Sequence, residues 1–213
     1  MPLASSSVPR DGVHISGPAP DASSSSTFPP SLLTLLVGHG SRGAVERLIL
    51  EAAARSQSAL VVCGDNRLDA YRLLAQARAV GLEDAVADGV LLARAFTVHQ
   101  FVALIDETLP LMARERDDVG VAIVTGLLGP FLAEDVRDAE SRTLLTRCLR
   151  ALVAWTATTG FPVVATTRQA DSARASDLLA LARGVVWGVY SPEPSVLKTG
   201  PQTRIEAFAT VTA

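Results

Sequence analysis

Lysine is almost absent from this chain. Of its 19 basic residues, 18 are arginine, and the single lysine is Lys198, close to the C-terminal end. Nucleotide loops of the GxxxxGK[ST] type use a lysine to neutralise the β- and γ-phosphates. No lysine can therefore do this work in the first 197 residues.

Cysteines and long apolar runs are also scarce. Cys63 and Cys148 lie far apart and form no CxxC or metal-spaced cluster, so we expect neither a disulfide framework nor a zinc site. The longest apolar run, residues 32–37, is of strand length and far short of the roughly 18 residues that span a bilayer. The N-terminus lacks the basic and apolar segments of a signal peptide, which favours a cytoplasmic protein without membrane contact.

The charge and the ends of the chain set further limits. A formal net charge of −3 gives no overall attraction to nucleic acid, so any DNA contact needs a local basic patch. Residues 1–31 hold six of the twelve prolines and nine serines, and such a segment cannot bury enough apolar surface to order itself. We therefore expect a flexible Ser/Pro-rich tail at 1–31 and one core domain at 32–213.

From residue 32 onward, short apolar runs alternate with helical patterns, which predicts an α/β fold with a mostly parallel sheet flanked by helices. Strands are expected at 32–37, 59–63, 90–95, 119–124 and 161–166, and helices at 44–56, 69–80, 98–114 and 141–158. On the helix at 69–80, Tyr71, Leu74 and Ala77 are expected near one face. Two closing strands at 185–190 and 204–211, joined by a short connection, predict a C-terminal antiparallel pair.

A glycine-rich segment, residues 38–43, follows the first predicted strand. Gly38, Gly40 and Gly43 lie in it, with the GxxxxG spacing of a phosphate loop. A loop between a strand and a helix is where such a site belongs, because backbone N–H groups and the helix N-terminus favour an anion. An ordinary glycine-rich turn is the alternative.

The residues that follow the loop lack the chemistry of ATP hydrolysis. Ala44 takes the place of the lysine, and Val45 takes the place of the Ser or Thr that holds magnesium. The loop can still present backbone donors, and Arg42 can replace part of the missing charge, with a solvated loop arginine as the alternative. Binding of ATP or ADP without hydrolysis is therefore one hypothesis.

Several segments of the core resemble the RecA/RadA recombinase family. The run ARAF at 93–96, followed by HQ at 99–100, resembles the RadA branch. Residues 119–124 resemble that family's Walker B strand, and residues 161–169 resemble the strand that ends in its nucleotide-sensing glutamine. The order and spacing of these segments agree from about residue 32 to the C-terminus, which implies a RecA-like core.

The resemblance also implies roles for single residues. The family's catalytic glutamate would fall at Asp65, a shorter carboxylate for which a simple turn aspartate is the alternative. The Walker B aspartate would fall at Thr125, which cannot support magnesium as a carboxylate does. Gln169 matches the nucleotide sensor, and a polar residue at a strand end is the alternative. Because the lysine, the hydroxyl and the Walker B carboxylate are all missing, we expect no ATP hydrolysis by the usual route and no required cofactor.

DNA binding is implied weakly. The first DNA-binding loop would lie near 133–141, which holds four carboxylates and one arginine and so opposes contact with phosphates. The second would lie near 170–176, where Arg168, Arg174 and Arg183 give modest basic character. Single-stranded DNA is therefore a weaker candidate partner than a protein, either a recombinase, a repair factor or a second copy of the chain.

The leading hypothesis is a catalytically silent RecA/RadA-like interaction module in DNA recombination, repair or damage response. A third hypothesis comes from residues 36–42, which resemble the opening of CbiX-type sirohydrochlorin chelatases, where a histidine takes part in metal insertion. His39 would then be a base or metal ligand, and an ordinary turn histidine is the alternative. The remaining histidines, His14 and His99, lie outside any glycine-rich histidine loop of that family's type.

Overall fold

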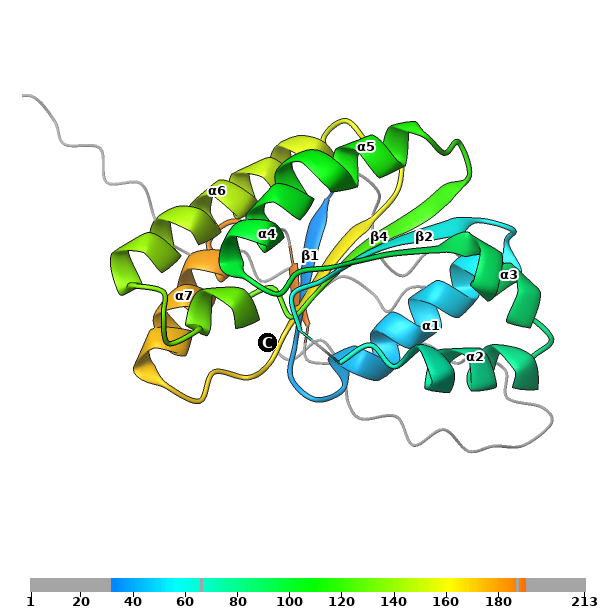
Figure 1. Cartoon of the computed structure of the whole chain (residues 1–213), viewed down its shortest axis with the longest axis horizontal. Coiled ribbons are helices and arrows are strands. Elements are labelled where there is room, and N and C mark those ends of the chain that lie inside the picture. The colour runs from blue at the N-terminus through cyan, green and yellow to red at the C-terminus, as the bar shows by residue number, and fades with distance from the viewer. Residues whose placement is uncertain (1–31, 66, 187, 191–213) are drawn as a thin grey trace, which may run out of the picture.

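The computed structural model describes residues 32–65, 67–186 and 188–190. They form a six-stranded sheet between two layers of helices (Figure 1). The strands lie in the order β3-β2-β4-β5-β1-β6, and every neighbouring pair is parallel. They are β1 (Leu33–Val37), β2 (Ser58–Cys63), β3 (Val90–Arg94), β4 (Val119–Thr125), β5 (Val163–Thr167) and β6 (Gly188–Tyr190). The predicted α/β class with a parallel sheet is confirmed.

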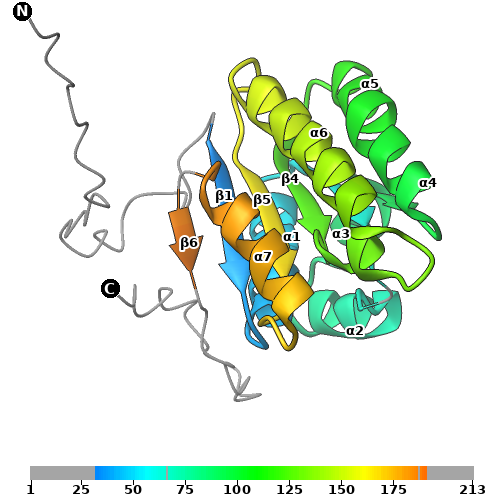
Figure 2. The same cartoon turned by 90° about the vertical axis from the view of Figure 1, so that its left-hand side faces the viewer.

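The helices divide between the two faces of the sheet, as Figures 1 and 2 show. One face carries α1 (Ser41–Ala54), α2 (Ala70–Ala79) and α3 (Glu83–Gly89). The other carries α4 (Val98–Ala103), the π-helical turn η1 (Leu104–Thr108), α5 (Leu109–Arg114), the 3₁₀ turn η2 (Gly129–Leu132), α6 (Asp138–Thr156) and α7 (Ala173–Arg183). Right-handed crossovers explain the division, because the chain steps one way along the sheet from β1 to β3 and the other way from β3 to β6.

The strands β1, β2 and β5 are buried along their whole length, and β4 almost so. A parallel sheet covered by helices on both faces needs apolar residues in succession, which is why these strands read as runs of Val, Leu, Ile and Ala. On the α4–α7 side, Phe101 and Phe131 pack edge to face with ring centroids 5.8 Å apart. The edge strand β3 is only partly buried.

The expected C-terminal antiparallel pair is not confirmed. The strand β6 runs parallel to β1, and residues 204–211 lie outside the described residues. The parallel direction of β6 follows from α7, a helix that the sequence patterns did not predict. Because α7 carries the chain back along the sheet after β5, the next strand starts from the same edge as β5 and points the same way.

Three further expectations need correction. Helix α1 begins at Ser41 and not at Ala44, and α3 is an additional short helix between residues 80 and 90. The predicted apolar face of α2 was wrong in part. Leu73 and Ala77 are buried, whereas the Tyr71 side chain is 88% exposed.

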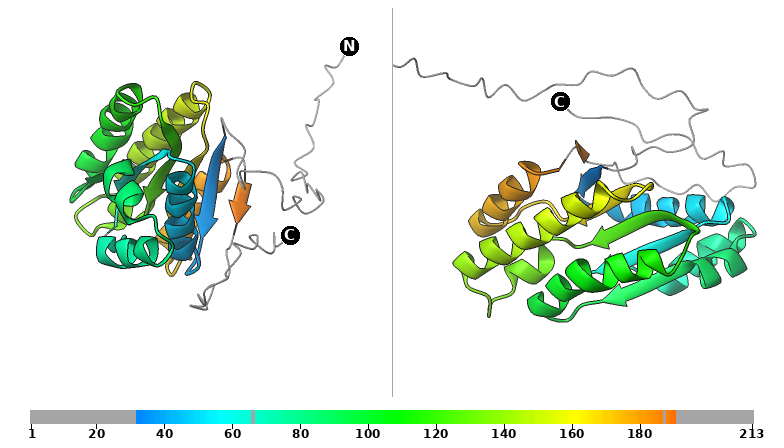
Figure 3. Two further views of the ribbon diagram at one scale, coloured as in Figure 1. Left: turned by 90° about the vertical axis from the view of Figure 1, so that its right-hand side faces the viewer. Right: turned by 90° about the horizontal axis from the view of Figure 1, so that it is seen from above.

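The strand order determines where a ligand can enter. Helices α1 and α7 follow the neighbouring strands β1 and β5 but lie on opposite faces, and the same holds for α2 and α6 after β2 and β4. In open α/β sheets such switch points form a crevice at the carboxyl ends of the strands. Viewed from above, these ends lie along one edge of the sheet (Figure 3).

Over the described part of the chain, we find no helix with the length and apolar character to cross a membrane.

Candidate functional site

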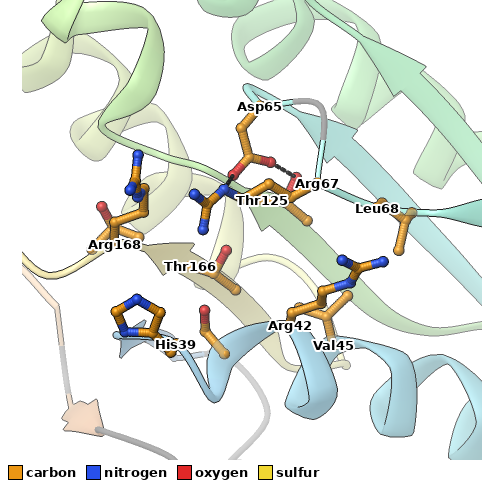
Figure 4. Close-up of a pocket in the computed structure, with 11 residues that line it drawn as sticks. His39, Arg42, Val45, Asp65, Arg67, Leu68, Thr125, Thr166 and Arg168 are labelled. Atoms are coloured by element: carbon orange, nitrogen blue, oxygen red, sulfur yellow. Dashed lines mark hydrogen bonds and ion pairs between the residues drawn. The ribbon is translucent and has the colours of Figure 1, made fainter. Parts of the chain in front are cut away.

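A pocket lies at the carboxyl ends of the four central strands, with a cavity volume of about 40 Å³. Its walls come from the β1–α1 loop and the start of α1, from the segment after β2, and from the last residues of β4 and β5. The lining residues are His39, Ser41, Arg42, Val45, Asp65, Arg67, Leu68, Thr125, Thr166, Thr167 and Arg168 (Figure 4). Pockets that enclose whole drug-sized ligands reach several hundred Å³, so this one suits a small group.

The β1–α1 loop is shorter than the sequence predicted. Gly38 has a φ of +103°, and its N–H donates to the carbonyl oxygen of Thr167 at 3.0 Å, which closes the turn against β5. The Ser41 hydroxyl donates to the Gly38 carbonyl at 2.7 Å. Because α1 begins at Ser41, only residues 38–40 form the loop, and Gly43 lies in the first helical turn. Gly38 and Gly40 are therefore turn residues, whereas Gly43 is not.

Asp65 and Thr125 meet in the pocket. The Thr125 hydroxyl donates to the Asp65 carboxylate at 3.0 Å, across the ends of β2 and β4. Gly126 makes this approach possible, since a Cβ at that position would lie 2.4 Å from the Asp65 Cγ atom. The Gly126 N–H in turn donates to the Thr166 hydroxyl at 3.2 Å, which ties β4 to β5. The resemblance assigns Asp65 and Thr125 to two positions of one catalytic centre, and the fold brings them into contact.

Positive charge dominates the lining. Arg42, Arg67 and Arg168 contribute guanidinium groups, while Asp65 is the one carboxylate among the lining residues. Arg67 lies 3.8 Å from Asp65, and Arg168 has no ion-pair partner among the described residues. Figure 4 shows Arg168 and His39 on one side of the pocket and Arg42 on the other. The N-terminus of α1 adds its partial positive charge, so the pocket favours an anion.

Glu46 is a residue of this region that the sequence analysis missed. Its side chain is only 1% exposed, and its carboxylate is 3.2 Å from Arg42, 3.2 Å from Arg72 and 3.0 Å from the amide nitrogen of Gln76. A buried carboxylate needs such partners, because an unpaired charge is costly to bury. The signal was the i, i+4 spacing of Arg42 and Glu46, which joins two residues only when both are helical. The predicted helix began only at Ala44, which placed Arg42 in the loop, so the pair was not recognised.

The remaining predicted site residues are not brought together. Gln169 is exposed beyond the end of β5 and does not line the pocket. Arg183 is exposed at the far end of α7, an 11-residue helix and so about 16 Å long. Of the three arginines proposed to contact DNA, only Arg168 lies at the pocket.

Arg174 has a structural role in this fold. Its guanidinium donates to the carbonyl oxygens of Phe131 and Val136, and to the Ser141 hydroxyl at 2.8 Å. It also lies 2.9 Å from the carboxylate of Asp138. These contacts fasten the segment before α6 to the start of α7. A first DNA-binding loop was expected near residues 133–141, which overlap this segment.

The histidines do not converge. His39 is exposed at the pocket, and His99 on α4 lies 3.5 Å from Glu140. Within residues 32–190, leaving aside 66 and 187, no group of three His, Cys, Asp or Glu residues is placed to hold a metal ion. His14 lies outside the described residues.

Cys63 ends strand β2 near the pocket, and its side chain is fully buried. Burial raises the pKa of its thiol, and a hydrogen bond with Thr125 and the charge of Arg94 only partly offset this. A buried thiol with a raised pKa holds little reactive thiolate. The chemistry of the pocket therefore lies in its arginines, hydroxyls and single carboxylate.

Comparison of the sequence with models of known protein families gives no match, and comparison with curated proteins gives none either.

Proposed function

We propose that this chain is a catalytically silent RecA/RadA-like protein that acts as an interaction module in DNA recombination, repair or damage response. The observation that carries the proposal is the contact between Asp65 and Thr125 beside the β1–α1 loop. The RecA/RadA resemblance places a catalytic carboxylate and a magnesium-supporting carboxylate at these two positions. Their meeting at one pocket supports that alignment of the chain with the family.

The strand order favours the same interpretation over two other nucleotide-binding folds. In the Rossmann and flavodoxin-like sheets the first two strands are neighbours. Here β4 and β5 separate β1 from β2. A Rossmann-type dinucleotide site is therefore not supported.

The residues at the pocket lack the means of phosphoryl transfer. Ala44 is fully buried in α1, Val45 presents methyl groups to the pocket, and Thr125 brings a hydroxyl where a carboxylate would support magnesium. Phosphoryl transfer depends on a metal ion and fixed positive charge at the phosphates. With these groups replaced, a role through binding is favoured over a role in catalysis.

The proposed absence of ATP hydrolysis is tested by measuring magnesium-dependent phosphate release from ATP, in the presence and absence of single-stranded DNA. We expect no release above that of buffer, and no difference between the wild type and Asp65→Ala. Turnover by the wild type that Asp65→Ala abolishes would overturn the proposal. The interaction is tested by sedimentation of the purified chain alone and in a mixture with the recombinase of the same cell. If this chain sediments as a monomer in both runs, the result counts against the interaction.

A second candidate function is binding of a phosphate group without hydrolysis. It is favoured by Arg42, Arg67 and Arg168 around a cavity of about 40 Å³, which suits the phosphate end of a nucleotide better than its base. Isothermal titration with pyrophosphate, ADP and ATP should then give similar affinities for all three. Arg168→Gln should weaken them about tenfold, the effect of losing one charge-assisted hydrogen bond. No heat from any of them at millimolar concentration would exclude this function.

A further inference from the structure

We infer that Glu46 is a positioning residue for Arg42, holding that guanidinium at the pocket so that it can receive a phosphate-type oxyanion. This role rests on the phosphate-binding function proposed above. It assigns to an acidic residue a part in binding an anion, and it explains how a chain without the usual lysine keeps a fixed cation beside the β1–α1 loop.

The two oxygens of the Glu46 carboxylate have different partners. Oε2 accepts from Gln76 at 3.0 Å and lies 3.2 Å from Arg72, and both partners belong to α2. Oε1 accepts from Nε of Arg42 at 3.2 Å. The carboxylate is thus anchored by α2 through one oxygen and offers the other to Arg42.

Arg42 is suited to being held in this way. Its side chain is 38% exposed and lines the pocket, while Glu46 is 1% exposed, so the fixed partner is inside and the cation faces the ligand space. A second carboxylate, Asp69, lies 3.6 Å from its Nη2 atom. A free arginine side chain loses about 2 kcal/mol of rotamer entropy when it is fixed. Restraint before binding removes part of this cost from the affinity for an anion.

The sign of one substitution tests the role of Glu46. Glu46→Gln removes a negative charge near an anion site, so charge alone predicts tighter binding of pyrophosphate. Positioning predicts weaker binding, by about tenfold, similar to the loss in Arg42→Gln. Glu51→Gln removes the same charge later in α1, where the partner is Arg55, and should leave the affinity unchanged. The double variant of Arg42 and Glu46 should bind no more weakly than Arg42→Gln alone.

Two further measurements guard against loss of the fold. Glu46→Asp keeps the charge but withdraws the carboxylate by one methylene, and it should also weaken pyrophosphate binding. The NMR signal of the Arg42 Nε–H group should exchange slowly with water in the wild type without ligand, and rapidly in both Glu46 variants.

The outcomes separate this role from the function on which it rests. A wild type that binds no pyrophosphate overturns both. A wild type that binds it, with Glu46→Gln binding equally well or better, overturns the role of Glu46 and leaves the phosphate-binding function intact.

Discussion

Gly126 is the residue on which the Asp65–Thr125 contact depends. Its φ of +63° lies in the left-handed region, and a Cβ there would meet the Asp65 side chain at 2.4–2.7 Å. Gly81 also has a positive φ, +73°, but nothing lies within 4 Å of its Cβ position. The two glycines therefore separate backbone strain from steric overlap.

We expect Gly81→Ala to cost about 1 kcal/mol of the free energy of unfolding, from strain alone. Gly126→Ala should cost clearly more, about 2–4 kcal/mol, because overlap with Asp65 is added to the strain. Urea denaturation of both variants measures the difference. Asp65→Ala combined with Gly126→Ala should recover part of the loss, and equal losses in the two single variants would contradict the packing described.

Sequence patterns located the strands well because buried parallel strands are continuous apolar runs, as in β2 and β4. They failed at α7, because its polar residues Arg174, Ser176 and Asp177 are typical of a loop. They also failed at the start of α1, because the GxxxxG spacing suggested a loop through Gly43. Contacts between elements, such as Glu46 with Arg72, depend on how two helices pack and have no signature along the chain.

The joint between β2 and β4 carries a pH-sensitive contact. The Ser58 hydroxyl, at the start of β2, donates to the Asp118 carboxylate at 2.6 Å, just before β4. That hydrogen bond, helped by Arg116, holds the pKa of Asp118 below its usual range. The folded-state pKa of Asp118 is lower than its unfolded-state pKa. The contact therefore contributes fully to the free energy of unfolding at a pH above the unfolded-state pKa, and this contribution is lost as the pH falls through the folded-state pKa.

Asp118→Asn should therefore lower the free energy of unfolding at pH 7, and its deficit relative to the wild type should shrink below about pH 4, where the unfolded carboxyl group is protonated. Urea denaturation from pH 7 to pH 2.5 measures this. Asp135→Asn is the matched control, because Asp135 is exposed on a loop and should show no such change. A constant deficit across the pH range would exclude the contact as its cause.

At the scale of the whole molecule, the two cysteines report on global opening. Cys63 and Cys148 are both fully buried, on opposite faces of the sheet. Burial, reinforced by the charge of Asp106, raises the pKa of Cys148 to about 12. Neither thiol has a route to a reagent while the sheet is closed.

During the short time in which both thiols are labelled in urea, we expect no labelling of either thiol at pH 8 in the native state, as counted by mass spectrometry. In native buffer, slow labelling of the two thiols should occur at rates set by the same global opening. Ser176→Cys places a thiol on the exposed side of α7 and should react at once. Rapid reaction of Cys63 or Cys148 in native buffer would contradict the packed sheet.

The position of β1 has a consequence for synthesis of the chain on the ribosome. Strand β1 is the first of the described strands to be synthesised. It lies between β5 and β6, which are the last two to be synthesised. When the chain has emerged only as far as α5, β2 and β3 can pair, but β1 has no neighbour. Strand β1, which leads into the pocket, therefore stays unpaired while more than a hundred further residues are translated. Contacts between segments so far apart in the chain form slowly. A nascent chain of this protein has reason to need a chaperone until β5 arrives.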